Sequence, residues 1–186
     1  MSTVAPQSYA PALLPLEAAV PASILETVLT PYLPHCRYLR SVAVEKESSG
    51  TALLKAHGRF SIPESCYIAD TGHFNAVEFN ICYNQLTYSL LAQAIDNQLL
   101  NVLGTWNLSE FTRRQLSDFL IVDFTSTFRR SLNARQFEGW VEINKITVRH
   151  RNIFMKTSCS FEDQSGASSH GGAVIVILNG REEHAQ

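Results

Sequence analysis

The sequence is short of charged residues. Only 17% of its 186 residues are Asp, Glu, Lys or Arg, whereas ordinary soluble domains have about 25%. The net charge is −2, which disfavours a nucleic-acid-binding protein, because such proteins carry a basic surplus. Since the chain is also 45% hydrophobic, part of its surface should face another subunit or an apolar ligand rather than water.

Long apolar runs are also missing. The longest uninterrupted one is Ala173–Leu178, far short of the ~20 apolar residues that a membrane span needs. No Lys or Arg precedes Arg37, which disfavours the charged start of a secretory signal and an Arg-rich transit peptide. We therefore expect a cytoplasmic protein without a membrane span.

Cysteine is scarce, and its spacing fits no metal site. The four cysteines are Cys36, Cys66, Cys82 and Cys159. They form no Cys-x-x-Cys pair, and no His-x-x-x-His or His-Glu-x-x-His motif accompanies them, so we predict no bound metal and reduced thiols. A Gly-x-Ser-x-Gly elbow and a Ser-His-Asp order are absent as well, which argues against a catalytic triad.

Proline is unevenly spread, and this predicts the domain organisation. Six of the seven prolines lie in the first 34 residues. Residues 1–22 are rich in Ala and Pro without a sustained period, which is typical of a flexible tail. The end of the chain, 181–186, is polar. We expect one folded domain over residues 23–180.

Hydrophobic periodicity predicts a mixed α+β protein. A short helix is expected over Ala22–Tyr32, and a second one after Asn107, whose spacing to Glu110 is that of a capping box. Strand patterns occupy six segments: 36–46, 51–60, 118–128, 137–149, 153–161 and 172–178. The first two should form a hairpin across a turn at Ser48–Gly50, and the last three should be antiparallel neighbours. A phase change near Asn144–Lys145 predicts a β-bulge.

The segment His73–Ile95 is the most distinctive of the chain. It runs for 23 residues without Gly or Pro and has one charged residue, Glu78. Surface helices carry a polar stripe with several charges, so this helix should be buried almost all round. An antiparallel sheet must then wrap around it, which is the architecture of a single hotdog fold.

The start of that helix is a candidate anion site. Gly72 allows another group to approach the backbone closely. Free amides at a helix start, together with the helix dipole, attract negative charge and would stabilise the oxyanion that develops on a thioester carbonyl. The alternative is that Thr71-Gly72-His73 is only a junction between a loop and a helix.

Glu78 is a candidate general base. Burial raises the pKa of a carboxyl group toward the range in which it can exchange protons. An α-helix turns by about 100° per residue, so one stripe of this helix, next to Glu78, carries His73, Val77, Asn80, Asn84 and Tyr88. Most of these side chains are polar. The alternatives are a satisfied hydrogen-bond network or a subunit contact.

Arginines supply candidate anchors for a carboxylate or a phosphate. Arg37 and the pair Arg129-Arg130 lie near predicted strand ends. The alternative for each is ordinary solvation of a charged side chain. His57 and His150 lie within or at the end of strands and are more typical of packed or surface histidines.

Several motifs together resemble the FcoT-like thioesterase family over roughly residues 22–180. The most specific is the block Thr71-Gly72-His73-Phe74-Asn75-Ala76-Val77-Glu78. Others are Thr30-Pro31-Tyr32, Cys36-Arg37-Tyr38-Leu39, Glu64-Ser65-Cys66-Tyr67-Ile68, Tyr83-Asn84-Gln85-Leu86 and Phe128-Arg129. The resemblance implies a hotdog fold, homodimers or larger oligomers, and fatty acyl thioesters of coenzyme A or acyl carrier protein as substrates. It implies no further cofactor.

The resemblance also implies pocket residues and two alternative activities. It assigns Tyr32, Tyr67, Asn75 and Asn84 to the pocket. Some members add glycine to the β-carbon of a 2-enoyl thioester, and others are described as long-chain acyl thioesterases. We expect glycine addition, with thioester hydrolysis as a following step, because the stripe beside Glu78 is unusually polar. A plain acyl thioesterase and a non-catalytic acyl-carrier-binding module are the alternatives.

The predicted site therefore has two parts. The catalytic candidates are Glu78, His73, Asn75 and Tyr67. The substrate-binding candidates are Tyr32, Asn84, Gly72, Asn80, Arg37 and Arg129.

Overall fold

A computed structural model describes residues 19–46, 52–69 and 73–178. The helices are α1 (Ala22–Leu29), α2 (Ala76–Asp96) and α3 (Leu108–Arg114), with 3₁₀ turns at Pro34–Cys36 and Asn101–Leu103. The strands are β1 (Leu39–Glu45), β2 (Leu54–Phe60), β3 (Phe119–Phe128), β4 (Phe137–Arg149), β5 (Asn152–Glu162) and β6 (Ser168–Ile177). The predicted turn at 48–50 lies outside the described residues.

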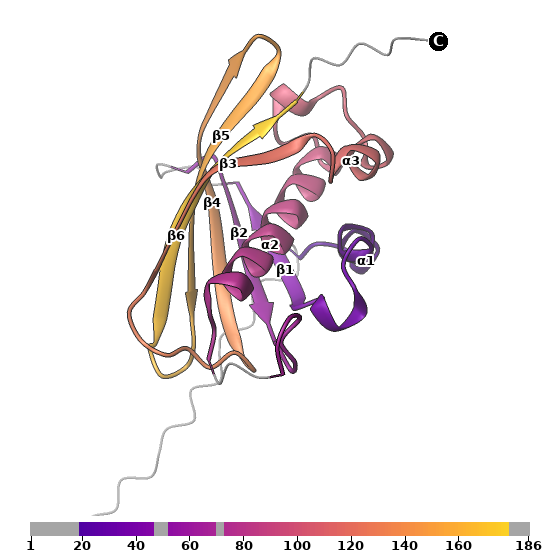
Figure 1. The fold of residues 1–186 in the computed structure, drawn as a ribbon. Helices are drawn as coiled ribbons and strands as arrows, with labels where there is room; N and C mark the ends of the chain where they lie inside the picture. Colours follow the sequence, from indigo (N-terminus) through magenta and orange to yellow (C-terminus); the bar gives the residue numbers. More distant parts are fainter. Residues whose placement is uncertain (1–18, 47–51, 70–72, 179–186) are drawn as a thin grey trace, which may run out of the picture.

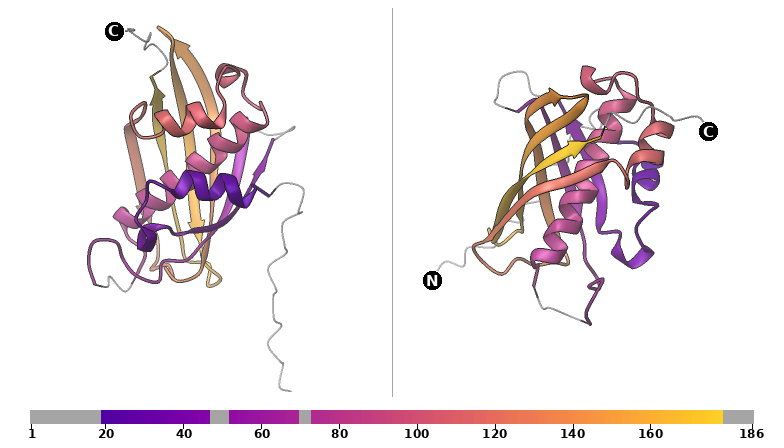
Figure 2. Two further views of the ribbon diagram at one scale, coloured as in Figure 1. Left: turned by 90° about the vertical axis from the view of Figure 1, so that its right-hand side faces the viewer. Right: turned by 45° about the horizontal axis from the view of Figure 1, so that its top comes forward.

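The strands form one antiparallel sheet in the order β1-β2-β4-β5-β6-β3. The sheet curls around α2, which lies along its concave side, while α1 and α3 cover the remaining flank of α2 (Figure 1, Figure 2). This confirms the predicted α+β hotdog architecture. The predicted bulge is confirmed too, because the register of β4 against β5 shifts between Ile143 and Lys145.

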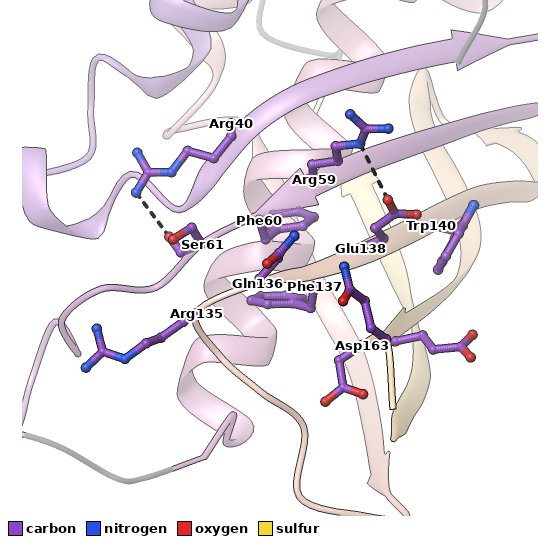
Figure 3. Close-up of a pocket in the computed structure, with 12 residues that line it drawn as sticks. Arg40, Arg59, Phe60, Ser61, Arg135, Gln136, Phe137, Glu138, Trp140 and Asp163 are labelled. Carbon is purple, nitrogen blue, oxygen red and sulfur yellow. Dashed lines mark hydrogen bonds and ion pairs between the residues drawn. The ribbon is translucent and has the colours of Figure 1, made fainter. Parts of the chain in front are cut away.

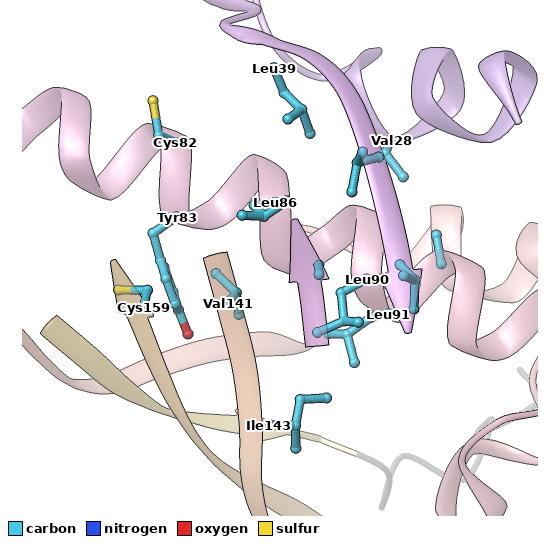
Figure 4. Close-up of a cluster of buried hydrophobic side chains, with 14 of the residues drawn as sticks. Val28, Leu39, Cys82, Tyr83, Leu86, Leu90, Leu91, Val141, Ile143 and Cys159 are labelled. Atoms are coloured by element: carbon cyan, nitrogen blue, oxygen red, sulfur yellow. The ribbon is translucent and has the colours of Figure 1, made fainter. Parts of the chain in front are cut away.

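The interior of α2 is as buried as its lack of charge predicts. From Cys82 to Ile95 only Asn84 and Tyr88 retain part of their exposure, whereas the first turns are less covered, with Val77 43% exposed. Its apolar side chains pack against those of the strands in one continuous core, part of which is drawn in Figure 4. No helix in the described ranges is long and apolar enough to cross a membrane.

The start of α2 differs from the prediction. The helix begins at Ala76 rather than His73, because Asn75 has an extended backbone (φ −126°, ψ −179°) and caps the first turn with its side chain. A residue whose side chain binds the first-turn amides ends the helix in that direction. His73 therefore precedes the helix and does not belong to the predicted stripe.

The fold also begins earlier than predicted. Ala19 pairs with Ala43 of β1, and the Val20 amide donates to the Val42 carbonyl over 2.9 Å. Ala19 and Val20, which were assigned to the predicted tail, therefore belong to the packed chain. The rest of the two predicted tails, 1–18 and 181–186, lies outside the described residues.

A buried glutamine joins α2 to the start of β1. Gln85 is fully buried, and its Oε1 accepts from the amides of Tyr38 and Leu39, each over 2.9 Å. Its Nε2 donates to the Cys36 carbonyl over 2.6 Å. One side chain thus pairs three backbone groups where the chain enters β1.

We predict that Gln85→Leu lowers the free energy of unfolding by about 3 kcal/mol, because each buried backbone group left unpaired costs about 1–3 kcal/mol. Urea unfolding measures the loss. Gln136→Leu, at an exposed position, is the matched control and should change stability by less than about 0.5 kcal/mol. Equal stability of the two variants would contradict the role assigned to Gln85.

Candidate functional site

The first turn of α2 is held by two side chains that cap each other. Asn75 Oδ1 accepts from the amides of Val77 (2.9 Å) and Glu78 (3.2 Å), and Glu78 Oε2 accepts from the Asn75 amide (3.3 Å). Glu78 is 1% exposed. Its carboxylate lies at the positive end of the helix dipole, where a negative charge is favourable.

This arrangement changes the predicted anion site. The amides of Val77 and Glu78 are already occupied by Asn75 Oδ1, so they are not available to a ligand. Thr71 and Gly72 lie outside the described residues, and the role predicted for Gly72 stays a prediction.

Asn75 supplies a donor of a different kind. Its Nδ2 is buried and has no hydrogen-bond partner among the described residues, and it belongs to the amide whose Oδ1 faces the helix start. A buried donor without a partner costs about 1–3 kcal/mol, so such a group is a good candidate for binding a ligand oxygen.

Two hollows meet beside this turn. The first, which we call the Phe74–Phe128 groove, has a volume of about 580 Å³ and is lined by His73, Phe74, Asn75, Ala76, Phe128, Arg129, Arg130 and Ser131. The second, which we call the Glu78 pocket, has a volume of about 210 Å³ and is lined by Ile62, Pro63, Glu64, Ser65, Ala69, His73, Glu78, Asn133, Ala134 and Arg135. His73 borders both.

The two hollows differ in chemistry. The groove has an aromatic floor, where the rings of Phe74 and Phe128 lie 6.3 Å apart, and two arginines on its rim. The Glu78 pocket is mainly polar: it combines a buried carboxylate with Arg135 and with Ser65, whose Oγ is buried and has no partner in the part of the chain that the structure describes. The groove suits an apolar chain, and the pocket suits a small polar molecule.

A third hollow, of about 440 Å³, lies where β2 ends and β4 begins (Figure 3). Its charged groups are largely engaged. Arg59 Nε lies 3.4 Å from Glu138 Oε1, and Asp163 accepts from the amides of Asn133, Ser165 and Ala167. Arg135 also borders this hollow, but its guanidinium points away from Glu138 and Trp140 in Figure 3.

The structure brings together part of the predicted site. Glu78, His73 and Asn75 share the start of α2, and Arg129 joins His73 and Asn75 in the groove. Asn84 Nδ2 donates to Asn80 Oδ1 over 2.7 Å, so these two residues form a half-buried pair farther along the helix. Their predicted contact with substrate stays a prediction.

The remaining candidates lie elsewhere. Arg37 donates to the carbonyls of Tyr32 (3.0 Å) and Thr30 (3.3 Å) just after α1. Those backbone contacts account for its position and fit the alternative to a substrate anchor. Tyr67 is 50% exposed in the loop before α2 and lines none of the three hollows.

The side chains of Cys82 and Tyr32 keep their protons. Burial raises the pKa of the Cys82 thiol well above its usual value, and the carboxylate of Glu78 raises it further. Burial likewise raises the pKa of Tyr32, beside Tyr88 and Cys82. Cys82 is therefore a poor nucleophile, whereas the Tyr32 hydroxyl remains a donor.

His57 has the structural role that its strand position predicts. Its Nε2 lies 2.9 Å from Glu138 Oε2, and its ring stacks on Trp140 at 4.6 Å. Within the described ranges, no group of three or more His, Cys, Asp and Glu side chains could hold a metal ion.

Sequence reasoning missed Ser65 and Arg135. Both enter the Glu78 pocket from loops that are distant in sequence, and Ile62 N joins these loops by donating to the Ala134 carbonyl over 2.8 Å. Ser65 stands within the motif Glu64-Ser65-Cys66-Tyr67-Ile68 without an assigned role, and Arg135 stands in no motif. Only the packing of the two loops makes them neighbours.

The model of the FcoT-like thioesterase domain matches residues 27–177. A protein of Streptomyces coeruleorubidus named (2E)-enoyl-[ACP] glycyltransferase is 49% identical over 162 residues, which are 84% of this chain and 96% of that protein. Proteins of the same name are 37% identical in Mycobacterium tuberculosis, covering 84% of this chain and 86% of that protein, and 33% identical in Mycobacterium marinum, covering 87% and 88%.

We predict that Asn75→Ala lowers the free energy of unfolding by about 1 kcal/mol, the usual cost of losing a helix cap. Asn75→Asp should lose much less, because its carboxylate still accepts from the two amides. Urea unfolding of both variants at neutral pH tests this. Equal losses would mean that the cap does not hold the start of α2.

Proposed function

The chain belongs to the FcoT-like thioesterase family, and on that premise we propose that it adds glycine to a 2-enoyl chain carried as a thioester on acyl carrier protein. The product is a 3-(carboxymethylamino)acyl thioester. The observation that carries this proposal is a small polar pocket around a buried carboxylate, beside an apolar groove, with His73 between them. The name of the relatives supports the same reaction.

Each hollow then takes one substrate. The Phe74–Phe128 groove receives the acyl chain, with the thioester oxygen at Asn75 Nδ2, and the Glu78 pocket receives glycine. The proposed reaction uses no cofactor besides the carrier that bears the thioester. Tyr32, Tyr67, Asn80, Asn84 and Arg129 remain proposed substrate contacts, with Tyr67 also a proposed catalytic residue.

The proposed chemistry is a conjugate addition. Glu78 takes a proton from the ammonium group of glycine, as a positioned general base does. The amine nitrogen bonds to C3, and the electron pair of the C2–C3 double bond shifts so that negative charge develops on the thioester oxygen. Asn75 Nδ2 donates to that oxygen, which stabilises the enolate. We assign His73 to the return of the proton to C2.

The edge strand β3 supports the further proposal of a homodimer. β3 pairs with β6 and stands at the end of the sheet, and it exposes Leu120, Ile121 and Val122. A long apolar edge invites pairing with another strand. We infer that a second copy of this chain covers it in an isologous contact, which accounts for part of the shortage of charge.

The first test of the function uses a 2-enoyl-acyl carrier protein and labelled glycine. We expect a labelled 3-aminoacyl adduct, detected by mass spectrometry on the carrier or, after hydrolysis, as the free acid. Free acid released at the same rate without glycine, and no adduct, would instead identify a plain thioesterase.

A second test concerns the base. Glu78→Gln should lower the rate of glycine addition at least about tenfold, within the ~10²–10⁴ range of a general base, while its amide oxygen can still accept from the Asn75 amide. Glu110→Gln, on α3, is the control and should keep full activity. Full activity of Glu78→Gln would remove Glu78 from the mechanism.

The dimer has its own test. Val122→Lys should shift the protein from dimer to monomer in light scattering, because it places a charge in the contact. Val148→Lys is the matched control: Val148 is similarly exposed, at 52% against 58% for Val122, but it lies on the inner strand β4. An unchanged mass for Val122→Lys would place the contact elsewhere.

A further inference from the structure

We propose that Arg135 holds the carboxylate of glycine in the Glu78 pocket, with the Ser65 hydroxyl as a second donor. This assignment rests on the proposed function, and it names a substrate anchor that sequence reasoning did not find. Glycine is a zwitterion, so its site needs a cation for the carboxylate and, at a short distance, a carboxylate that accepts the ammonium proton. Arg135 and Glu78 line the same pocket.

Most N–H donors of the Arg135 guanidinium form no hydrogen bond within the described chain. In the described chain it makes one hydrogen bond, from Nη1 to the Pro63 carbonyl over 3.3 Å, and no ion pair. A guanidinium presents several N–H groups in a planar fork that matches a carboxylate. The bond to Pro63 orients the side chain and leaves the rest of the fork for a ligand.

Ser65 supplies the second observation. Its Oγ is buried and has no partner in the described chain, although buried hydroxyl groups normally form hydrogen bonds. Ser65 lines the same pocket as Arg135. A carboxylate bound there would satisfy this hydroxyl as well as the guanidinium.

Other arginines fit the role less well. Arg37 donates to two backbone carbonyls beside α1, and Arg59 pairs with Glu138. Arg129 lines the groove but not the Glu78 pocket. In the lining of that pocket Arg135 is the one arginine, so the geometry favours it over Arg37 and Arg129 as the anchor for glycine.

The test compares wild type, Arg135→Gln and Arg135→Lys with glycine and with glycinamide as the amine. For Arg135→Gln we expect the KM for glycine to rise about 10- to 100-fold, as expected for lost hydrogen bonds to a charged group, and the KM for the enoyl thioester to stay within about twofold. The preference of wild type for glycine over glycinamide should collapse in Arg135→Gln. Arg135→Lys, which keeps the charge without the fork, should lie between them.

Arg149→Gln is the matched control, since Arg149 is exposed at the far end of β4, and its kinetics should equal those of wild type. Ser65→Ala should raise the KM for glycine by a smaller factor. An unchanged KM for glycine in Arg135→Gln, or an equal rise for both substrates, would overturn this assignment while the proposed function stands. A wild-type protein that forms no glycine adduct would overturn the proposed function itself.

Discussion

The reciprocal cap between Asn75 and Glu78 is the interaction on which the rest of the site depends. It sets where α2 begins, and α2 is the helix around which the whole sheet curls. It also brings a buried carboxylate to the wall of a polar pocket, and the Asn75 Nδ2 has no partner within the described segments. One local motif therefore determines both the start of the central helix and the two groups to which we assign the chemistry.

The surroundings of this turn come from distant parts of the chain. The loop that carries Ser65 and the segment that carries Arg135 are joined by the bond between Ile62 and Ala134, and together they close the Glu78 pocket. On the other side, Phe128 of β3 reaches Phe74 to form the groove. Since His73 borders both hollows, two substrates bound in them would meet at one place, and that proximity is itself a large part of catalysis.

The local sequence pattern predicted the helices and strands well. The features that it missed depend on how distant segments pack together. The uncharged interior of α2 and the phase change at Asn144 are local signals, and both were confirmed. The helix start was placed too early because His73 and Phe74 continue the run without Gly or Pro after Gly72, whereas the side chain of Asn75 ends the helix. For Arg37, the sequence cannot show that the carbonyls of Thr30 and Tyr32, just after α1, lie within its reach, and its contact with substrate stays a prediction. Nothing in the sequence around Arg135 marks it as a site residue, since its pocket forms only when distant loops come together in the fold.

The double role of Glu78 has a consequence for the reaction cycle. As a carboxylate it is stabilised by the Asn75 amide and by the helix dipole, and a proton would remove most of that stabilisation. In the proposed reaction the proton taken from glycine is therefore held at a site that disfavours it, so it is readily passed on to His73, to which we assign its return to C2. In that proposal the residue that starts the helix is also a transient proton store, which empties before the next turnover.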